Sequence, residues 1–168
     1  LIDLSKKTPG KLRSNRGGWQ SDTDLWNQEV FKPLLEKATN ITQNIIDYIS
    51  NKKPRMVIRS MWGNINPKGG MNFTHIHPTG WMSGVYYIQL PKDNNVITFE
   101  DPRPARMMDF QRSCLVKDEY FDYQVKVGDL ILFPSWLPHF VLPNTSDENR
   151  ISISFNIGCE STLEFNIL

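Results

Sequence analysis

Short β-rich segments fill most of the sequence after residue 54, and they limit the possible folds more than any other feature. Runs rich in Gly, Pro, Asn and Asp separate them, for example residues 66–70, 91–95 and 143–147. Several short strands at regular spacing predict an all-β sandwich or barrel. The expected strands are Met56–Trp62, Trp81–Leu90, Val96–Phe99, Tyr120–Val127, Leu130–Phe133, Phe140–Leu142 and Arg150–Ile157.

The N-terminal part of the chain follows a different pattern. Residues 1–22 are expected to form a loop-like arm with an excess of Lys and Arg, for which solvation is a simpler explanation than an acidic partner. Apolar residues then recur at helical spacing over residues 24–50, which predicts an amphipathic helix. We expect this helix to pack on the β-core of residues 55–158, within a single domain of residues 23–168.

Length and composition exclude several classes of protein. The 168 residues suit one domain, and 19 Lys and Arg against 18 Asp and Glu argue against a protein that mainly coats nucleic acid. Cys114 and Cys159 are too few for a disulfide framework or a Cys-based zinc site, so we expect a reducing, cytoplasmic location. No apolar run reaches the roughly 18 residues of a membrane span. The missing initiator Met is consistent with a fragment.

The three histidines are the most informative residues. His75 and His77 are two apart in an extended context, so both side chains are expected on one face of a strand. His139 follows a Pro-bounded turn at the start of a later strand, which a closed β-architecture can bring opposite the first pair. We therefore predict a metal site. Neutral imidazoles suit Fe(II), Zn, Ni, Cu or Mn, so the ligands alone do not identify the metal.

Arg150 opens the last strand in an otherwise apolar setting. Strand alternation places Arg150, Ser152 and Ser154 on one face. A buried guanidinium requires an anion. That anion is either an internal carboxylate, such as Asp147 or Glu148, or the carboxylate of a bound small acid.

The order of these motifs resembles the Fe(II)- and 2-oxoglutarate-dependent dioxygenases of the prolyl-hydroxylase-like branch. It is especially similar to a group of 2-oxoglutarate oxygenases from phages and bacteria. The resemblance covers about residues 55–158. It rests on Gly69-x-x-Asn72-x-x-His75-x-His77, on Ser83-Gly84-Val85-Tyr86-Tyr87, on Leu132 to His139 with its Phe133-Pro134 pair, and on Arg150-x-Ser152.

The resemblance implies a double-stranded β-helix, or jelly roll, with the amphipathic helix packed on it. It also implies Fe(II), 2-oxoglutarate as cosubstrate, and O2. His75 and His139 would be metal ligands, and Arg150 would bind the distal carboxylate of 2-oxoglutarate with help from Tyr87 and Ser152. The enzyme would hydroxylate a small molecule or a protein side chain while 2-oxoglutarate is decarboxylated to succinate. A nucleic-acid substrate is less favoured.

The sequence departs from the family's pattern at His77, where relatives carry a carboxylate ligand. His77 is itself a ligand, or Glu100 or Asp101 substitutes, or the activity is changed. We favour His77 because it already shares a face with His75. Asn72 also replaces the tyrosine that many relatives carry.

Two alternatives remain at this stage. A three-histidine cupin that does not use 2-oxoglutarate would explain Gly69, His75, His77 and His139. However, residues 78–81 lack the expected acid, and Arg150 would have no required role. A non-catalytic β-domain would use aromatic side chains to stack a ligand, namely Trp62, Trp81, Tyr86 and Trp136.

Overall fold

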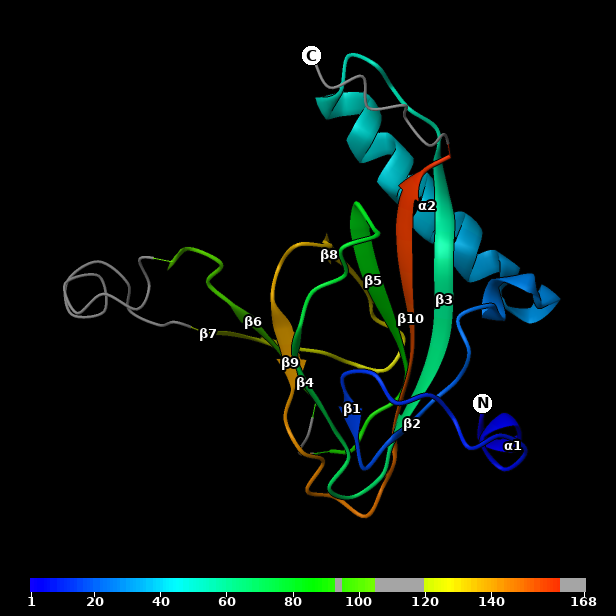
Figure 1. Ribbon diagram of the computed structural model, residues 1–168, viewed down its shortest axis with the longest axis vertical. Helices are drawn as coiled ribbons and strands as arrows, with labels where there is room; N and C mark the ends of the chain where they lie inside the picture. The colour runs from blue at the N-terminus through cyan, green and yellow to red at the C-terminus, as the bar shows by residue number, and fades with distance from the viewer. Residues whose placement is uncertain (93–94, 105–119, 161–168) are drawn as a thin grey trace.

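The computed structural model describes residues 1–92, 95–104 and 120–160, and these form two antiparallel five-stranded sheets (Figure 1). We call the sheet with order β1-β4-β9-β6-β7 sheet A, and the sheet with order β2-β3-β10-β5-β8 sheet B. The predicted all-β jelly roll with one packed helix is confirmed. The strands are β1 (Asn15–Arg16), β2 (Trp19–Gln20), β3 (Met56–Asn66), β4 (Met71–His75), β5 (Met82–Gln89), β6 (Val96–Glu100), β7 (Tyr120–Gln124), β8 (Leu130–Pro134), β9 (His139–Val141) and β10 (Arg150–Cys159).

Sheet B has different side chains on its two faces because strand residues alternate. Ile153, Phe155 and Ile157 of β10 are almost fully buried in a core that includes Ala38 and Ile46 of helix α2 (Lys32–Ile49). Helix α2 therefore covers the outer face of sheet B (Figure 1). The alternate residues of β10 face the space between the sheets, where the polar side chains collect.

The helix is shorter than the expected span of residues 24–50. Two 3-10 turns, η1 (Leu25–Asn27) and η2 (Glu29–Phe31), precede it, and Pro33 lies in its first turn. Proline has no backbone N–H and fits only the first turn of an α-helix, which explains why α2 begins at this point.

The N-terminal arm is more ordered than the expected loop. Residues 1–22 contain α1 (Ile2–Ser5) and the short strands β1 and β2. Strand β1 pairs with β4 of sheet A, and β2 pairs with β3 of sheet B. The arm therefore contacts both sheets.

Two further expectations concern loops and membranes. The sequence has its longest non-periodic segment over residues 101–117, which is expected to be a loop, and of these only 101–104 lie within the described residues. In the described parts of the chain, no helix is long and apolar enough to cross a membrane.

Candidate active site

The structure brings the three predicted histidines together at the ends of short strands. His75 is the last residue of β4 and pairs directly with His139, the first residue of β9. His77 lies two residues beyond β4, and its backbone N–H donates to the Ser135 carbonyl at 2.9 Å. One ligand atom from each imidazole lies within 4.8 Å of the others. This arrangement is compact enough for all three to bind one ion.

Hydrogen bonds fix the tautomers of two of these rings. Nδ1 of His75 donates to the Phe73 carbonyl at 2.7 Å, and Nδ1 of His139 donates to the Leu137 carbonyl at 2.9 Å. Since a carbonyl oxygen only accepts, each Nδ1 carries the proton and each Nε2 keeps its lone pair. Such second hydrogen bonds orient imidazoles that bind metals.

Burial keeps all three imidazoles neutral at pH 7. Desolvation lowers the pKa of His75, and it lowers the pKa of His139 to about 4. The pKa of His77 falls to about 3, mainly through burial and further through repulsion from His75 and His139. Neutral imidazoles are the form that binds metal ions, so the donor set fits a divalent transition metal.

Aromatic rings surround the histidines. The Trp62 ring centroid lies 5.5 Å from that of His77, and the Phe133 ring centroid lies 4.7 Å from that of His139. His139 is only 4% exposed. These contacts explain the desolvation and exclude bulk water from one side of the cluster.

The carboxylates considered as substitutes for His77 lie in other interactions. Glu100 accepts a hydrogen bond from Thr74 Oγ1 at 2.6 Å, and Asp101 is ion-paired with Arg103. Among the described residues, the cluster suited to a metal consists of the three histidines alone. The geometry therefore favours His77 as the third ligand.

Arg150 is buried and held beside Tyr87. Its Nη1 donates to the Val96 carbonyl at 2.7 Å, its Nη2 lies 3.4 Å from the Tyr87 hydroxyl, and it is 3% exposed. Burial lowers the pKa of Arg150 and raises that of Tyr87. Asp147, one of the internal partners considered for Arg150, instead pairs with Lys68 at 2.9 Å.

One cavity of about 670 Å³ joins the histidines to Arg150. Its volume lies within the range of about 300–1,000 Å³ typical of small-molecule sites. Ser152 and Tyr87 both line it, as do Asn64 and Ser154, whose side chains share a 3.0 Å hydrogen bond. All six predicted site residues therefore border the same space.

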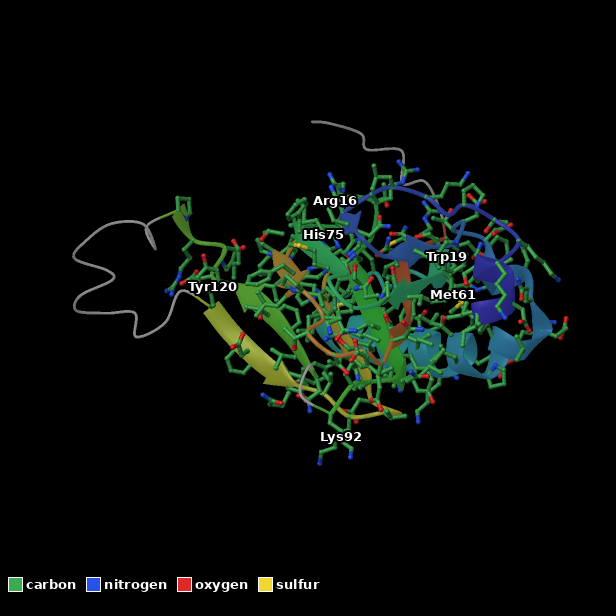
Figure 2. The ribbon with its side chains drawn as sticks, turned by 90° about the horizontal axis from the view of Figure 1, so that it is seen from below. Arg16, Trp19, Met61, His75, Lys92 and Tyr120 are labelled. Carbon is green, nitrogen blue, oxygen red and sulfur yellow. The ribbon has the colours of Figure 1, made fainter. Side chains whose placement is uncertain are left out.

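A chain of polar side chains beside His75 was not predicted. Asn66 Nδ2 donates to Asn72 Oδ1 at 2.9 Å, and Asn72 Nδ2 donates to Ser14 Oγ at 3.2 Å. Ser14 Oγ in turn lies 3.5 Å from His75 Nε2. Figure 2 labels Arg16 of β1 and His75 of β4; these strands pair through Asn15↔Asn72 and Arg16↔Met71, and this pairing brings Ser14 to its position. Asn72, at the position where many relatives carry tyrosine, was a sequence signal for these hydrogen-bonded polar side chains. Nothing in the sequence pointed to Ser14.

Comparison with solved structures supports the fold. A prolyl-4-hydroxylase from Pseudomonas putida superposes with a TM-score of 0.65 at 16% identity, covering 95% of this chain and 80% of that one. HygX from Streptomyces hygroscopicus, with nickel, 2-oxoglutarate and hygromycin B bound, gives 0.65 at 13% identity, with 95% and 76% covered. A 2OG-Fe(II) oxygenase family protein from Burkholderia pseudomallei gives 0.58 at 15% identity; 77% of this chain is covered, but only 55% of that chain's length.

The sequence itself identifies the family. No curated protein matches the chain. The profile of a family described as "Putative 2OG-Fe(II) oxygenase" matches residues 60–156, which include every histidine, Tyr87, Arg150 and Ser152. The match favours an oxygenase over the cupin and the binding-domain alternatives. The chain belongs to this family of 2OG-Fe(II) oxygenases, whose cofactors are Fe(II) and 2-oxoglutarate.

Proposed function

We propose that this protein is an Fe(II)- and 2-oxoglutarate-dependent oxygenase that hydroxylates a small molecule or a protein side chain. The observation that carries the proposal is the single cavity that joins three neutral imidazoles to a buried guanidinium. The first group suits a divalent metal, and the second suits the carboxylate of an acid.

The proposed metal ligands are His75, His77 and His139, each through a ring nitrogen. When bound, Fe(II) supplies oxygen activation coupled to the decarboxylation of 2-oxoglutarate to succinate. The carbonyls of Phe73 and Leu137 hold two of the rings in the correct tautomer, and the Ser135 carbonyl holds the backbone of His77. These contacts orient the ligands before a metal arrives.

Arg150 is the proposed anchor for the distal carboxylate of 2-oxoglutarate. Its guanidinium lies in a desolvated part of the cavity, where a charge-assisted hydrogen bond is strong. The Tyr87 hydroxyl beside it supplies a further donor. Ser152 lies two residues after Arg150 on β10, and Asn64 is its partner on β3. The anchor therefore fixes one end of the cosubstrate and directs the other toward the histidines.

The three-histidine set changes the charge of the centre. A site with one carboxylate ligand would neutralise one of the two charges of Fe(II), whereas three neutral imidazoles neutralise none. The dianionic cosubstrate then provides the compensating charge, so we expect 2-oxoglutarate to strengthen metal binding more than it would at a site with a carboxylate.

The test is an anaerobic titration of the Fe(II)-loaded protein with 2-oxoglutarate. A keto acid that chelates Fe(II) gives a weak visible charge-transfer band. We expect this band in the wild-type protein and a much weaker response in Arg150→Gln, because the distal carboxylate loses its partner. If Fe(II) binds with normal stoichiometry but no band forms, the proposed use of 2-oxoglutarate at this centre is wrong.

A further inference from the structure

The N-terminal arm forms part of the wall of the active-site cavity. Arg13 and Ser14 line it, together with Gln20 and Thr23 from the same segment. The arm is held at this place because the Phe73 N–H donates to the Ser14 carbonyl at 2.9 Å. Since Ser14 Oγ lies 3.5 Å from His75 Nε2, this wall is next to the proposed metal ligands.

The backbone on both sides of Arg13 is fixed. Its N–H donates to Asn15 Oδ1 at 2.8 Å, and its carbonyl accepts from Arg16 Nη1 at 3.0 Å. Asn15 is itself 3% exposed. The ion pairs between described residues involve other cations of the arm, namely Lys6 and Lys11, but not Arg13. Arg13 is thus an exposed residue on a fixed backbone at the border of the cavity.

The cavity wall carries an excess of positive charge. Arg13 and Arg150 are its two permanent cations, and none of the described residues that line it is Asp or Glu. Fe(II) and 2-oxoglutarate bring charges of equal size and opposite sign, so the loaded site keeps the charge of the two guanidinium groups. A cationic substrate is disfavoured in such a site, and an anionic one is attracted.

The two guanidinium groups differ in accessibility. Arg150 is buried and bonded to Val96 and Tyr87. Arg13 is an exposed residue, next in sequence to Ser14, which lies beside His75. The proposed function assigns Arg150 to the cosubstrate. Arg13 is therefore the cation that a second molecule entering the cavity can reach.

We propose that Arg13 binds an anionic group of the prime substrate, so that this enzyme hydroxylates a molecule carrying a carboxylate or a phosphate monoester. The inference rests on the proposed function, because it needs 2-oxoglutarate at Arg150. The planar guanidinium can donate a pair of parallel hydrogen bonds to a carboxylate or to a phosphate monoester. Arg13 would therefore recognise either group in the same way.

The test uses the Ni(II)-loaded protein with 2-oxoglutarate and a set of small molecules in matched forms. Each scaffold is supplied as a carboxylate, a phosphate monoester, a primary amide and an amine. Thermal shift finds the forms that stabilise the protein, and calorimetry measures their Kd. We expect the stabilising forms to be anionic, and the better of the two anion classes identifies the substrate's group. Arg13→Gln should weaken them about tenfold, the loss of one hydrogen bond to a charged group.

Two variants serve as controls. Arg13→Lys keeps the charge and should retain part of the affinity. Lys11→Gln removes a charge from the same arm, but Lys11 pairs with Asp22 at 3.2 Å outside the cavity, so this variant should bind the anions as the wild type does. If anions were attracted only by the general positive charge of the arm, Arg13→Gln and Lys11→Gln would weaken anion binding equally.

The outcomes separate this inference from the proposed function. The charge-transfer band of the wild-type protein with Fe(II) and 2-oxoglutarate is recorded first, and its absence would count against the proposed function. If the band forms, the Arg13 proposal is overturned by any of three results: amides or amines bind as well as anions, Arg13→Gln binds anions normally, or no anion of the set binds.

Discussion

The two sheets hold the two halves of the site in different ways. In sheet B, β10 pairs with β3 at ten positions, from Arg150↔Asn66 to Cys159↔Met56, with one register shift after Asn156. In sheet A, β4 and β9 share two paired positions with an irregularity between them, and one of these is His75↔His139. Figure 1 shows the long arrows of β3 and β10 beside the short ones of β4 and β9. The proposed cosubstrate anchor, Arg150, thus stands at the first residue of a long ladder, whereas the proposed metal ligands stand at or just beyond the ends of short strands.

This difference predicts where the structure depends on ligands. The neighbours of Arg150 on β10, Ile151 and Ile153, belong to a continuous buried strand. The rings of His75 and His139 are held by hydrogen bonds to backbone carbonyls of short segments, those of Phe73 and Leu137. We therefore expect sheet B to keep its geometry without a metal, and the histidine end of sheet A to be stabilised by one.

The largest expected effect is the loss of the metal from sheet A. His139→Ala should weaken Fe(II) binding by about 4 kcal/mol, roughly 1,000-fold, one share of the roughly 10–16 kcal/mol that a full ligand set supplies to zinc. Anaerobic calorimetry with Fe(II) measures this, and far-UV circular dichroism checks that the sheets remain. Stoichiometric metal binding at unchanged affinity would remove His139 from the centre.

The next effect breaks the anchor on sheet B without disturbing sheet A. Arg150→Gln should leave Fe(II) affinity nearly unchanged and weaken 2-oxoglutarate by about 3 kcal/mol, because a buried carboxylate then lacks its charged partner. Tyr87→Phe removes only the hydroxyl that lies 3.4 Å from Arg150 and should cost about 1 kcal/mol. Both values come from the charge-transfer titration. An anchor elsewhere would leave both variants at wild-type affinity.

The pH dependence of the metal-free protein should come mainly from sheet A. The pKa of His77 is about 3 and that of His139 about 4, whereas both are near 6.5 in an unfolded chain. Between these values the unfolded chain binds more protons, so stability is full above pH 6.5 and is lost as the pH falls toward 4. Between these pKa values, each such histidine lowers the free energy of unfolding by about 1.4 kcal/mol for every unit by which the pH falls.

Urea unfolding of the metal-free protein at pH 7, 6 and 5 measures this slope. His139→Gln should make the slope shallower by one histidine's share, because glutamine does not titrate. A metal that occupies the centre should raise the stability at each of these pH values and leave the slope nearly unchanged, because the folded imidazoles are already unprotonated above pH 5. Equal slopes in the wild type and His139→Gln would contradict the burial of a neutral imidazole.

The two regions also differ in how far the sequence could predict them. Alternation in β10 placed Arg150 and Ser152 on one face, and the His-x-His spacing placed His75 and His77 on another. His139 could be placed from the Pro-bounded turn before it. Strands β1 and β2 are two residues each, too short for a hydrophobic period, so the arm was expected to be a loop. These two strands form only by pairing with β4 and β3, which are far from them in the sequence and adjacent only in the folded protein. For this reason the contact of Ser14 with His75 and the position of Arg13 at the cavity could not be inferred from the sequence.

The smallest predicted effect concerns Ser14, where the arm meets sheet A. In the metal-free protein, Nδ1 of His75 is occupied by Phe73, so Ser14 Oγ–H donates to the Nε2 lone pair over 3.5 Å. A metal would take the same lone pair and displace this donor. Ser14→Ala should therefore lower the stability of the metal-free protein by up to about 1 kcal/mol and that of the metal-bound protein by less. By linkage, Fe(II) affinity should rise by up to about fivefold. Calorimetry with Fe(II) distinguishes this from a structural contribution of Ser14 to metal binding, which would lower the affinity instead. Ser5→Ala is the matched control, because its hydroxyl bonds to Ile2 in α1, away from the cavity.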